Sequence, residues 1–583
     1  MRISRRLLAL AAAVLAATPT AQAARPSPQP RIVNGAFTSQ QPTVAAILKG
    51  ISPDTAAQWC TATLIGCQTV LTAAHCVCDA EGAACQPDGA QPPQPNRYFV
   101  FLQHAGTFAV DRIAVHPSYA ADVADIAVLH LAAPVTGIAP TPINRTSAPP
   151  HGMTGAIVGF GRQGGPVSDY GLKRAGNVAI AGCPSGVSND TSVCWNFAAP
   201  AGPAGSNSNT CHGDSGGPLF VDFGCGPVVA GVTTDGVNAD CTIGDHSWDA
   251  NVFAFTSFID AVAPGELGQD HCGPGRQVGD PSVNVNSQVA TLSSNLPDDT
   301  LTIPVAANTA ELRVTLNGVD TPSVFENFDL YVRFGAAPTT TQYDCRSNGS
   351  NQFGECLIPL PTAGTWYAVA HRISGTGTAQ LTATTFPVGP AGTGPVAPSC
   401  DDGSTCTTRD TCQAGQCIGT PAPRTTCHQP AGTARSRLVV RNMANDRRDA
   451  MKWTATQLEV RDSDLGDPAT TAYEVCVFDQ QSGTPRLALD ARVPPGSGWQ
   501  RTARSLTFRD HAASNGGIRA LRLKTGATNG SIHLRGAGLN LSTPQLPLDP
   551  RVIIQVGNAD ACWEADFSRT QRNRLRQFRA RSD

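Results

Sequence analysis

The sequence predicts an all-β protein with several domains. Short runs of β-forming residues, separated by Gly, Pro, Asn and Asp, fill most of the chain. The exception is segment 252–262, whose C-terminal half has the apolar spacing of a helix. Runs and turns of this kind are typical of β-barrels and β-sandwiches. At 583 residues the chain is also too long for a single hydrophobic core. We therefore expect roughly three or four β domains.

The N-terminus predicts export. In residues 1–23, Arg2, Arg5 and Arg6 precede an apolar stretch, and Ala21-Gln22-Ala23 is typical of a signal-peptidase site. An uncleaved membrane anchor is the alternative, but the apolar run is shorter than the roughly 20 residues of a spanning helix. No later segment is long and apolar enough to span a membrane. We expect a secreted, extracellular protein, and the sequence leaves a periplasmic stage open.

Composition narrows the expected partners. Twenty cysteines indicate an oxidising compartment. The formal net charge of −3 is small for this length, so it predicts no nucleic-acid partner. No D-x-D-x-D-G calcium loop occurs. We expect no cofactor and no metal, and the sequence does not determine the oligomeric state.

The first β region covers residues 32–265 and follows a short proline-rich segment, 24–31, that ends in Arg31. Predicted strands in this region include 45–48, 70–72, 99–102, 157–160 and 228–232. Residues 266–285 are rich in Gly, Pro and polar groups and predict a linker. A second β region, 286–388, follows, in which apolar and polar residues alternate as in half-buried strands.

Residues 389–432 are predicted to form a Cys-rich linker. The five cysteines lack a C-x-x-C pair, which favours a disulfide knot over zinc. Five is an odd number, so one cysteine is expected to pair outside, with Cys272 a candidate. β-type runs return in 433–568, where Cys476 and Cys562 are a candidate pair. The arginine-rich end, 569–583, favours a mobile solvated tail over a segment that docks on an anionic surface.

Four segments carry the functional signal. A glycine-rich turn, 210–219, contains Ser215; Thr72-Ala73-Ala74-His75-Cys76 lies upstream; Asp125 opens the apolar run 125–131; and Arg31-Ile32-Val33-Asn34-Gly35 lies near the N-terminus. The order His, Asp, Ser is that of the chymotrypsin type. The chain resembles the secreted trypsin/chymotrypsin-family serine proteases. Residues 286–388, with Asp329-Leu330-Tyr331-Val332-Arg333, resemble the bacterial pre-peptidase C-terminal (PPC) domain.

The resemblance implies a double β-barrel protease domain, followed by a β-sandwich, the Cys-rich linker and a second β-rich domain. In that domain Ser215 would be the nucleophile, His75 the base and Asp125 the residue that orients the histidine. Asp122 is a competitor for the acid, but Asp125 is preferred because the apolar run follows it directly. The N–H groups of Gly213 and Ser215 would form the oxyanion hole.

The resemblance also implies a zymogen. Cleavage after Arg31 would free an ammonium at Ile32, which could pair with the buried carboxylate of Asp214. Residues 24–31 would then be an activation propeptide. The sequence leaves open whether the enzyme activates itself or needs another protease.

The specificity pocket departs from the trypsin pattern. Asn209 stands six residues before the nucleophile, where trypsins carry an aspartate, and a neutral amide weakens contact with a basic side chain. The wall residues would be Thr234, Asp235 and Gly236. Negative charge could come from Asp235, Asp245 or Asp249. The expectation is a polar pocket of unknown specificity.

Several disulfides follow from the resemblance: Cys60–Cys76, Cys183–Cys194 and Cys211–Cys241, with Cys345–Cys356 as a staple of the second domain. Cys67, Cys78, Cys85 and Cys225 remain unassigned. The resulting hypothesis is a secreted serine endopeptidase that acts on protein or peptide substrates. Two alternatives are a catalytically silent adhesion or binding protein on a protease scaffold, and an enzyme that mainly hydrolyses esters.

Overall fold

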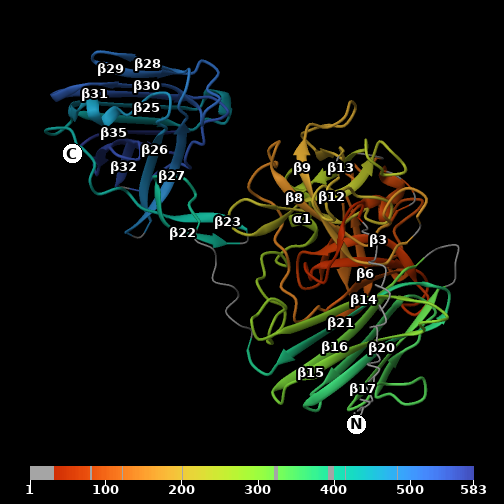
Figure 1. Cartoon of the computed structure of the whole chain (residues 1–583). Coiled ribbons are helices and arrows are strands. Elements are labelled where there is room, and N and C mark those ends of the chain that lie inside the picture. Colours follow the sequence, from red (N-terminus) through yellow and green to blue (C-terminus); the bar gives the residue numbers. More distant parts are fainter. Residues whose placement is uncertain are drawn as a thin grey trace, which may run out of the picture.

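The computed structural model describes residues 32–583, except 79, 81, 121–122, 168, 200, 321–325, 391–399, 414, 482 and 550. The predicted signal peptide, the propeptide with Arg31, and Asp122 lie outside the described residues. Figure 1 shows β structure throughout: two barrels, a sandwich packed against them (green), and a separate C-terminal domain (blue) reached through a small hairpin. The prediction of an all-β, multidomain chain is confirmed.

The first barrel is closed, in the order β2-β3-β4-β7-β6-β5. Two of its strands, β2 and β4, are buried along almost their whole length, so their side chains are covered on both faces of the sheet. The predicted runs 45–48, 70–72 and 99–102 lie in three of them. The strands are β2 (Val44–Lys49), β3 (Ala57–Leu64), β4 (Thr69–Thr72), β5 (Tyr98–Leu102), β6 (Gly106–Val115) and β7 (Ala127–Leu131).

The second barrel has the order β9-β10-β13-β12-β11-β8 and closes through pairing of β8 with β9, while β1 (Ala36–Phe37) extends β9. Helix α1 (Thr256–Val262) ends the domain, which agrees with the helical spacing expected there. The barrel strands are β8 (Thr154–Gly159), β9 (Arg174–Ala181), β10 (Ser192–Asn196), β11 (Pro218–Asp222), β12 (Pro227–Gly236) and β13 (His246–Asn251).

Residues 284–387 form a sandwich of two four-stranded sheets, β14-β21-β16-β19 and β15-β20-β17-β18. Alternate side chains meet between the sheets, as in the strictly alternating burial of β15. The strands are β14 (Asn284–Leu292), β15 (Asp298–Val305), β16 (Thr309–Gly318), β17 (Asn327–Phe334), β18 (Cys345–Ser347), β19 (Phe353–Pro359), β20 (Gly364–Ser374) and β21 (Gly377–Pro387).

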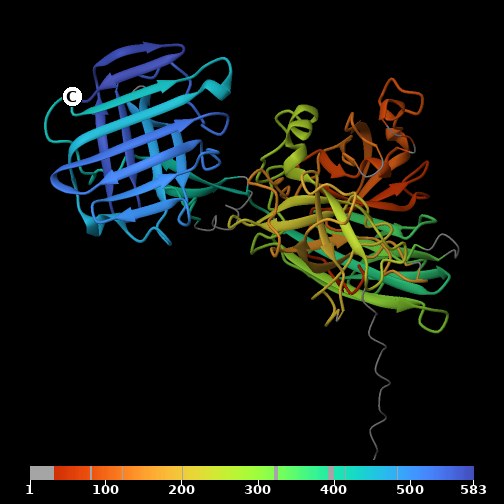
Figure 2. The same cartoon turned by 90° about the horizontal axis from the view of Figure 1, so that it is seen from above.

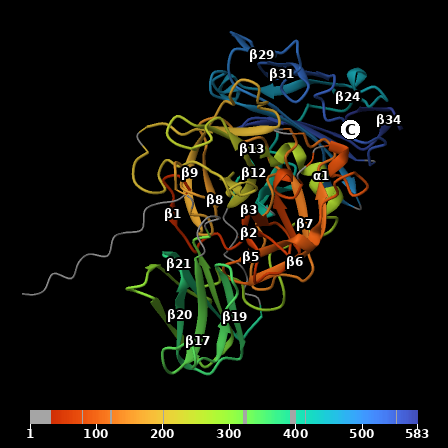
Figure 3. The ribbon, with the colours of Figure 1, turned by 90° about the vertical axis from the view of Figure 1, so that its right-hand side faces the viewer.

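The sandwich docks closely on the first barrel, as Figure 3 shows below β5. The Phe353 ring packs edge-on against Phe101, with ring centroids 5.0 Å apart. Arg313 donates to the carbonyl of Thr136 at 2.7 Å. Asp320 Oδ2 accepts the backbone N–H of Gln58 at 2.7 Å. Buried rings and paired polar groups together indicate one fixed arrangement rather than a flexibly linked appendage.

A hairpin of β22 (Thr407–Gln413) and β23 (Gln416–Pro421) connects the protease to the C-terminal domain. The expectation of a disulfide knot with one cysteine pairing outside was wrong. Of the five cysteines in this region, only Cys400 and Cys417 pair with each other. The other three pair outside it: Cys412 with Cys225, Cys406 with Cys476, and Cys427 with Cys562. The expectations of a Cys476–Cys562 pair and of Cys272 as the outside partner were wrong. Cys272 pairs with Cys67, 205 residues away.

The remaining pairs are local. They are Cys60–Cys76, Cys183–Cys194, Cys211–Cys241 and Cys345–Cys356, all named above from the sequence, together with Cys78–Cys85 and Cys400–Cys417. All twenty cysteines are therefore in disulfides, and no thiol remains for a zinc site.

The C-terminal domain is a second sandwich, of an eight-stranded sheet (β28-β29-β30-β31-β25-β24-β35-β34) against a four-stranded one (β27-β26-β32-β33) (Figure 2). The larger sheet contains β24 (Ser436–Arg441), β25 (Ala450–Val460), β28 (Trp499–Thr502), β29 (Ser505–Arg509), β30 (Ile518–Lys524), β31 (Gly526–Ala537), β34 (Thr570–Arg574) and β35 (Gln577–Arg581). The smaller one contains β26 (Tyr473–Gln481), β27 (Thr484–Val493), β32 (Val552–Gly557) and β33 (Cys562–Phe567).

The expectation of a mobile tail at 569–583 was wrong. These residues form the β34–β35 hairpin, and β35 pairs with β24 inside the large sheet. Phe578 and Ala580 are fully buried between the arginines, so β35 also contributes to the core. Within the described ranges, no helix is both long and apolar enough to cross a membrane.

Candidate active site

Ser215 lies in the turn that leads into β11, and side chains of β3 stabilise this turn through hydrogen bonds. The carbonyl of Gly213 accepts hydrogen bonds from Thr61 Oγ1 at 2.8 Å and Gln58 Nε2 at 3.2 Å. Gly213 has φ +87°, and a Cβ there would lie 2.7 Å from the ring of Tyr170, so only glycine fits. Among the described residues, the N–H groups of Gly213 and Ser215 have no acceptor. Two donors thus stand free beside the serine.

His75 and Asp125 are in direct contact. His75 lies in a short 3₁₀ turn, η1 (Ala74–Cys76), and Asp125 precedes β7. One oxygen of Asp125 accepts the backbone N–H of His75 at 2.9 Å, and the other lies 2.7 Å from Nδ1. Asp125 is 1% exposed, whereas the His75 side chain is 35% exposed. Because the carboxylate accepts a hydrogen bond from Nδ1–H, the proton of the neutral imidazole stays on Nδ1 and Nε2 has a free lone pair.

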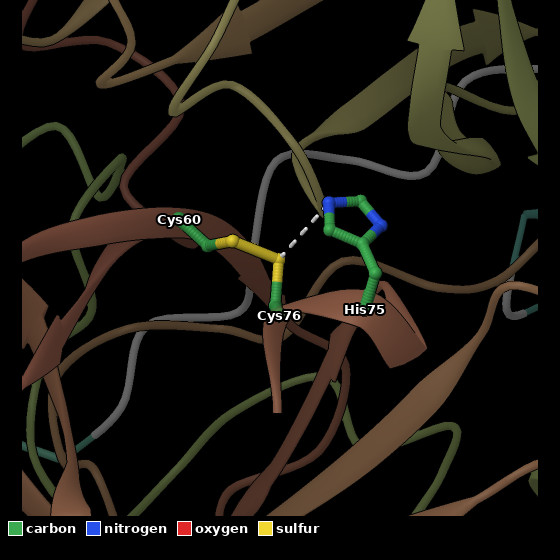
Figure 4. Close-up of side chains that lie close together, drawn as sticks. All are labelled: Cys60, His75 and Cys76. Atoms are coloured by element: carbon green, nitrogen blue, oxygen red, sulfur yellow. Dashed lines mark hydrogen bonds between the residues drawn. A yellow bond between two sulfur atoms is a disulfide. The ribbon is translucent and has the colours of Figure 1, made fainter. Parts of the chain in front are cut away.

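The histidine ring and Ser215 meet at the Cys60–Cys76 disulfide. Cys76 Sγ lies 3.9 Å from His75 Nε2 and 3.5 Å from the carbonyl oxygen of Ser215. Figure 4 shows the ring beside this bond. Although Cys60, His75 and Cys76 are close enough to suggest metal ligands, the two sulfurs are bonded to each other and offer no thiolate. The disulfide therefore lies against the histidine ring.

Asp214 is 1% exposed, and its two oxygens accept the backbone N–H groups of Gly161 at 2.7 Å and Cys211 at 2.9 Å. Burial raises the pKa of its carboxyl to about 7. A Cβ on Gly159 would lie 2.1 Å from Oδ1 of Asp214, and a Cβ on Gly161 would lie 2.6 Å from its carboxyl carbon. Any side chain at either position would therefore clash with the carboxylate. Neither glycine was predicted as a site residue, although the Gly159-Phe160-Gly161 spacing is visible in the sequence.

Ile32 is buried in the second barrel. Its side chain is 1% exposed and packs in the second-barrel core with Ile157 and Leu219. The following residue, Val33, exchanges two backbone hydrogen bonds with Asn209, of 2.9 and 3.0 Å. The segment after residue 31 is thus tied to the domain by backbone hydrogen bonds and by a buried side chain.

A pocket opens beside Ser215, and Thr234, Asp235 and Gly236 line it. Asn209 does not line it. Its amide oxygen accepts from the Trp195 indole at 2.9 Å and from Ser247 Oγ at 2.8 Å, and its nitrogen donates to Asp245 at 2.8 Å. Asn209 is therefore fully occupied within the fold, and it acts on the pocket through Asp245.

The three candidate carboxylates differ in position. Asp245 lines the pocket and is buried, and its Oδ1 accepts the backbone N–H groups of Asn238 at 2.9 Å and His246 at 2.8 Å. Asp235 is exposed at the rim. Asp249 lies off the pocket, and burial raises the pKa of its carboxyl well above the ordinary value, which favours the neutral acid. The sequence could not choose among these because the choice depends on strand register.

Comparison with known proteins agrees with this arrangement. The Trypsin family model matches residues 32–259, and the model of the bacterial pre-peptidase C-terminal domain matches 298–371. Serine protease SP24D of Anopheles gambiae is 35% identical over 210 residues, which cover 34% of this chain and 72% of that protein. Trypsin, alkaline C, of Manduca sexta is 29% identical over 293 residues, which cover 44% of this chain and 98% of that protein.

Among solved structures, neuropsin, a serine protease expressed in the limbic system of mouse brain, aligns with 22% identity and a TM-score of 0.31, covering 39% of this chain and 98% of that chain. The sequence relatives and the two family models decide the assignment. This chain is a serine-type peptidase that belongs to the trypsin family and carries a bacterial pre-peptidase C-terminal domain.

Proposed function

We propose that the protein is a secreted endopeptidase, made as a zymogen, that cleaves peptide bonds through an acyl-enzyme on Ser215. The observation that carries this proposal is the pair of hydrogen bonds between Asp125 and His75. One carboxylate oxygen accepts the backbone N–H of the histidine, and the other is bonded to Nδ1. This pair of hydrogen bonds fixes the tautomer that presents a basic Nε2. A binding protein on a silent scaffold has no need of this arrangement.

In the proposed reaction, Ser215 Oγ attacks the substrate carbonyl carbon while His75 Nε2 takes the hydroxyl proton. The negative charge on the carbonyl oxygen is stabilised by the N–H groups of Gly213 and Ser215, which have no acceptor among the described residues. The C–N bond then breaks, and His75 returns the proton to the leaving amine. Water repeats the sequence on the ester, releasing the acid and restoring the serine.

The zymogen proposal rests on Asp214. Its buried carboxylate has backbone donors, but ionisation remains unfavourable there, as the raised pKa of about 7 indicates. A cation at close range would offset that cost. Cleavage after Arg31 would create one at the amine of Ile32, whose side chain is already buried in the second-barrel core.

For the substrate, we propose a polar or basic side chain before the scissile bond. Asp245 and Asp235 both line the pocket, and none of its lining residues is a lysine or an arginine. A cationic side chain would therefore enter a field of negative charge. Secretion is supported by ten disulfides, which require an oxidising compartment, and by the export signal expected in residues 1–23.

The test uses the purified chain, cut after Arg31 and confirmed to begin with Ile32, on a peptide library. The control is the Ser215→Ala variant processed in the same way. Cleavage by the first protein and not by the second supports the acyl-enzyme. No cleavage by either would leave the silent-scaffold alternative, and activity confined to esters would leave the esterase alternative.

A further inference from the structure

The C-terminal domain has a charge that the whole chain conceals. Residues 433–583 contain 23 Lys and Arg against 15 Asp and Glu, a formal net charge of +8, while the whole chain carries −3. A strong asymmetry between parts of a chain indicates a charged partner for the unbalanced part. The position of these charges decides whether they act together.

They gather on the outer face of the eight-stranded sheet. Strand pairing places one residue from each of seven neighbouring strands in a row across it. Five of the seven are cationic; in order across the sheet the row reads Arg572, Arg579, Val439, Lys452, Arg535, Ala520 and Arg509. At roughly 4.8 Å between strands, the row is about 29 Å long.

A second row, two residues along the strands, contains Arg581, Arg437, His533 and Arg522. Neither row contains an Asp or a Glu. Partial burial lowers the pKa of His533, and the nearby positive charges of Arg522, Lys452 and Arg535 lower it further. These cations therefore form one continuous basic face, with the two rows as its members.

The face is hollowed and its cations are not neutralised. A depression of about 620 Å³ lies over the middle of the sheet, lined by six cations: Arg437, Arg441, Lys452, Arg519, Arg535 and Arg579. Within the described part of the chain, none of these six takes part in an ion pair. Arg579 Nε is buried and has no hydrogen-bond partner. By contrast, two arginines on the side of the smaller sheet are paired, Arg486 with Asp479 at 2.6 Å and Arg551 with Asp566 at 2.7 Å.

We propose that this basic face binds the phosphate backbone of double-stranded DNA. The two rows of the basic face offer cationic donors, chiefly guanidinium groups, whose forked geometry suits phosphate oxygens. They contain no Phe, Tyr or Trp on which bases of a single strand or sugar rings could stack. Their only larger apolar side chain is Val439, so nothing is available to insert into a lipid bilayer. A duplex, which presents phosphates outward and hides its bases, needs only what the face supplies.

The test measures binding of a 30-base-pair duplex of arbitrary sequence by fluorescence anisotropy. The protein is the full chain carrying Ser215→Ala, so that proteolysis does not consume the sample. Five phosphate contacts predict that the logarithm of the affinity falls with a slope of about −4.5 against the logarithm of salt concentration. The affinity should therefore drop about 500-fold between 50 and 200 mM NaCl.

The variant Lys452→Gln/Arg535→Gln removes two exposed cations from the centre of the row and should reduce the slope to about −2.7. The matched control, Arg486→Gln/Arg551→Gln, removes two arginines of the same domain outside the face and should leave the slope unchanged. An unchanged melting temperature of the central variant shows that it remains folded.

Three results would overturn the proposal: no DNA binding at 50 mM NaCl, equal losses in both double variants, or tighter binding to heparin or to phosphatidylserine vesicles than to the duplex. The last result would identify a sulfated polysaccharide or a membrane as the partner. Because the assay uses an inactive chain, its outcome is independent of the proposed peptidase mechanism.

Discussion

Replacement of Asp214 should have opposite effects on stability before and after activation. In the uncleaved chain, burial raises the pKa of this carboxyl from the ordinary 3.8 to about 7. The native state then binds a proton that the unfolded state releases. The free-energy cost of the native state is therefore absent below pH 3.8, grows between 3.8 and 7, and is complete above pH 7.

The size of this cost follows from the shift. About three pKa units correspond to about 4 kcal/mol at pH 8. Asp214→Asn removes the charge but replaces one oxygen that accepts the N–H of Gly161 or Cys211, a loss of about 1–2 kcal/mol. The uncleaved Asn variant should thus be more stable than the parent by about 2–3 kcal/mol at pH 8, by the difference of these terms. At pH 4 it should be no more stable.

After cleavage following Arg31, the new ammonium of Ile32 should pair with Asp214, and the sign should reverse. The Asn variant then leaves a buried cation without its partner, which typically costs about 3–5 kcal/mol. Scanning calorimetry of the four proteins, parent and variant, each uncleaved and cleaved, in the Ser215→Ala background, measures this cycle. A variant effect of the same sign in both forms would refute the reasoning.

Three further perturbations test other contacts of the structure. Burial lowers the pKa of Lys173 to about 7. The charged lysine therefore destabilises the native state below pH 7, and the free energy of unfolding rises as pH increases from 7 toward 10.5. Lys173→Met should remove this rise when the free energy of unfolding is compared at pH 7 and pH 10. Asp320→Ala removes the acceptor for the backbone N–H of Gln58 beside the loop that carries Ser215. We expect kcat to fall about three- to tenfold with KM nearly constant, since a misplaced transition-state contact reduces kcat. An unchanged kcat would show that the sandwich does not support that loop. The Cys225–Cys412 bond is the only disulfide that joins the chain before residue 388 to the chain after residue 399. A protease site inserted between residues 388 and 399 should therefore, after it is cut, still give one band on a non-reducing gel. Replacement of both cysteines by serine should give two bands.

Local sequence was sufficient for the features that depend on near neighbours. The predicted strands 45–48, 70–72, 99–102, 157–160 and 228–232 lie within or overlap strands of the two barrels, because alternation and turn residues act over a few positions. The glycine-rich setting of Ser215 was legible for the same reason. So was the expectation that His75 meets Asp125, although it came from resemblance of motifs rather than from spacing.

Tertiary structure decided the rest. Cys67 finds Cys272 across 205 residues, and no local pattern encodes such a partner. Asn209 faces Trp195 and Asp245 rather than the pocket, because its amide is held by hydrogen bonds to side chains that come from distant parts of the second barrel. The arginines at 569–583 suggested a tail when counted along the chain, yet Phe578 and Ala580 between them reach the core. A count of charges ignores direction, whereas a sheet sends alternate residues to opposite faces, so only the folded chain shows that the cations share one surface.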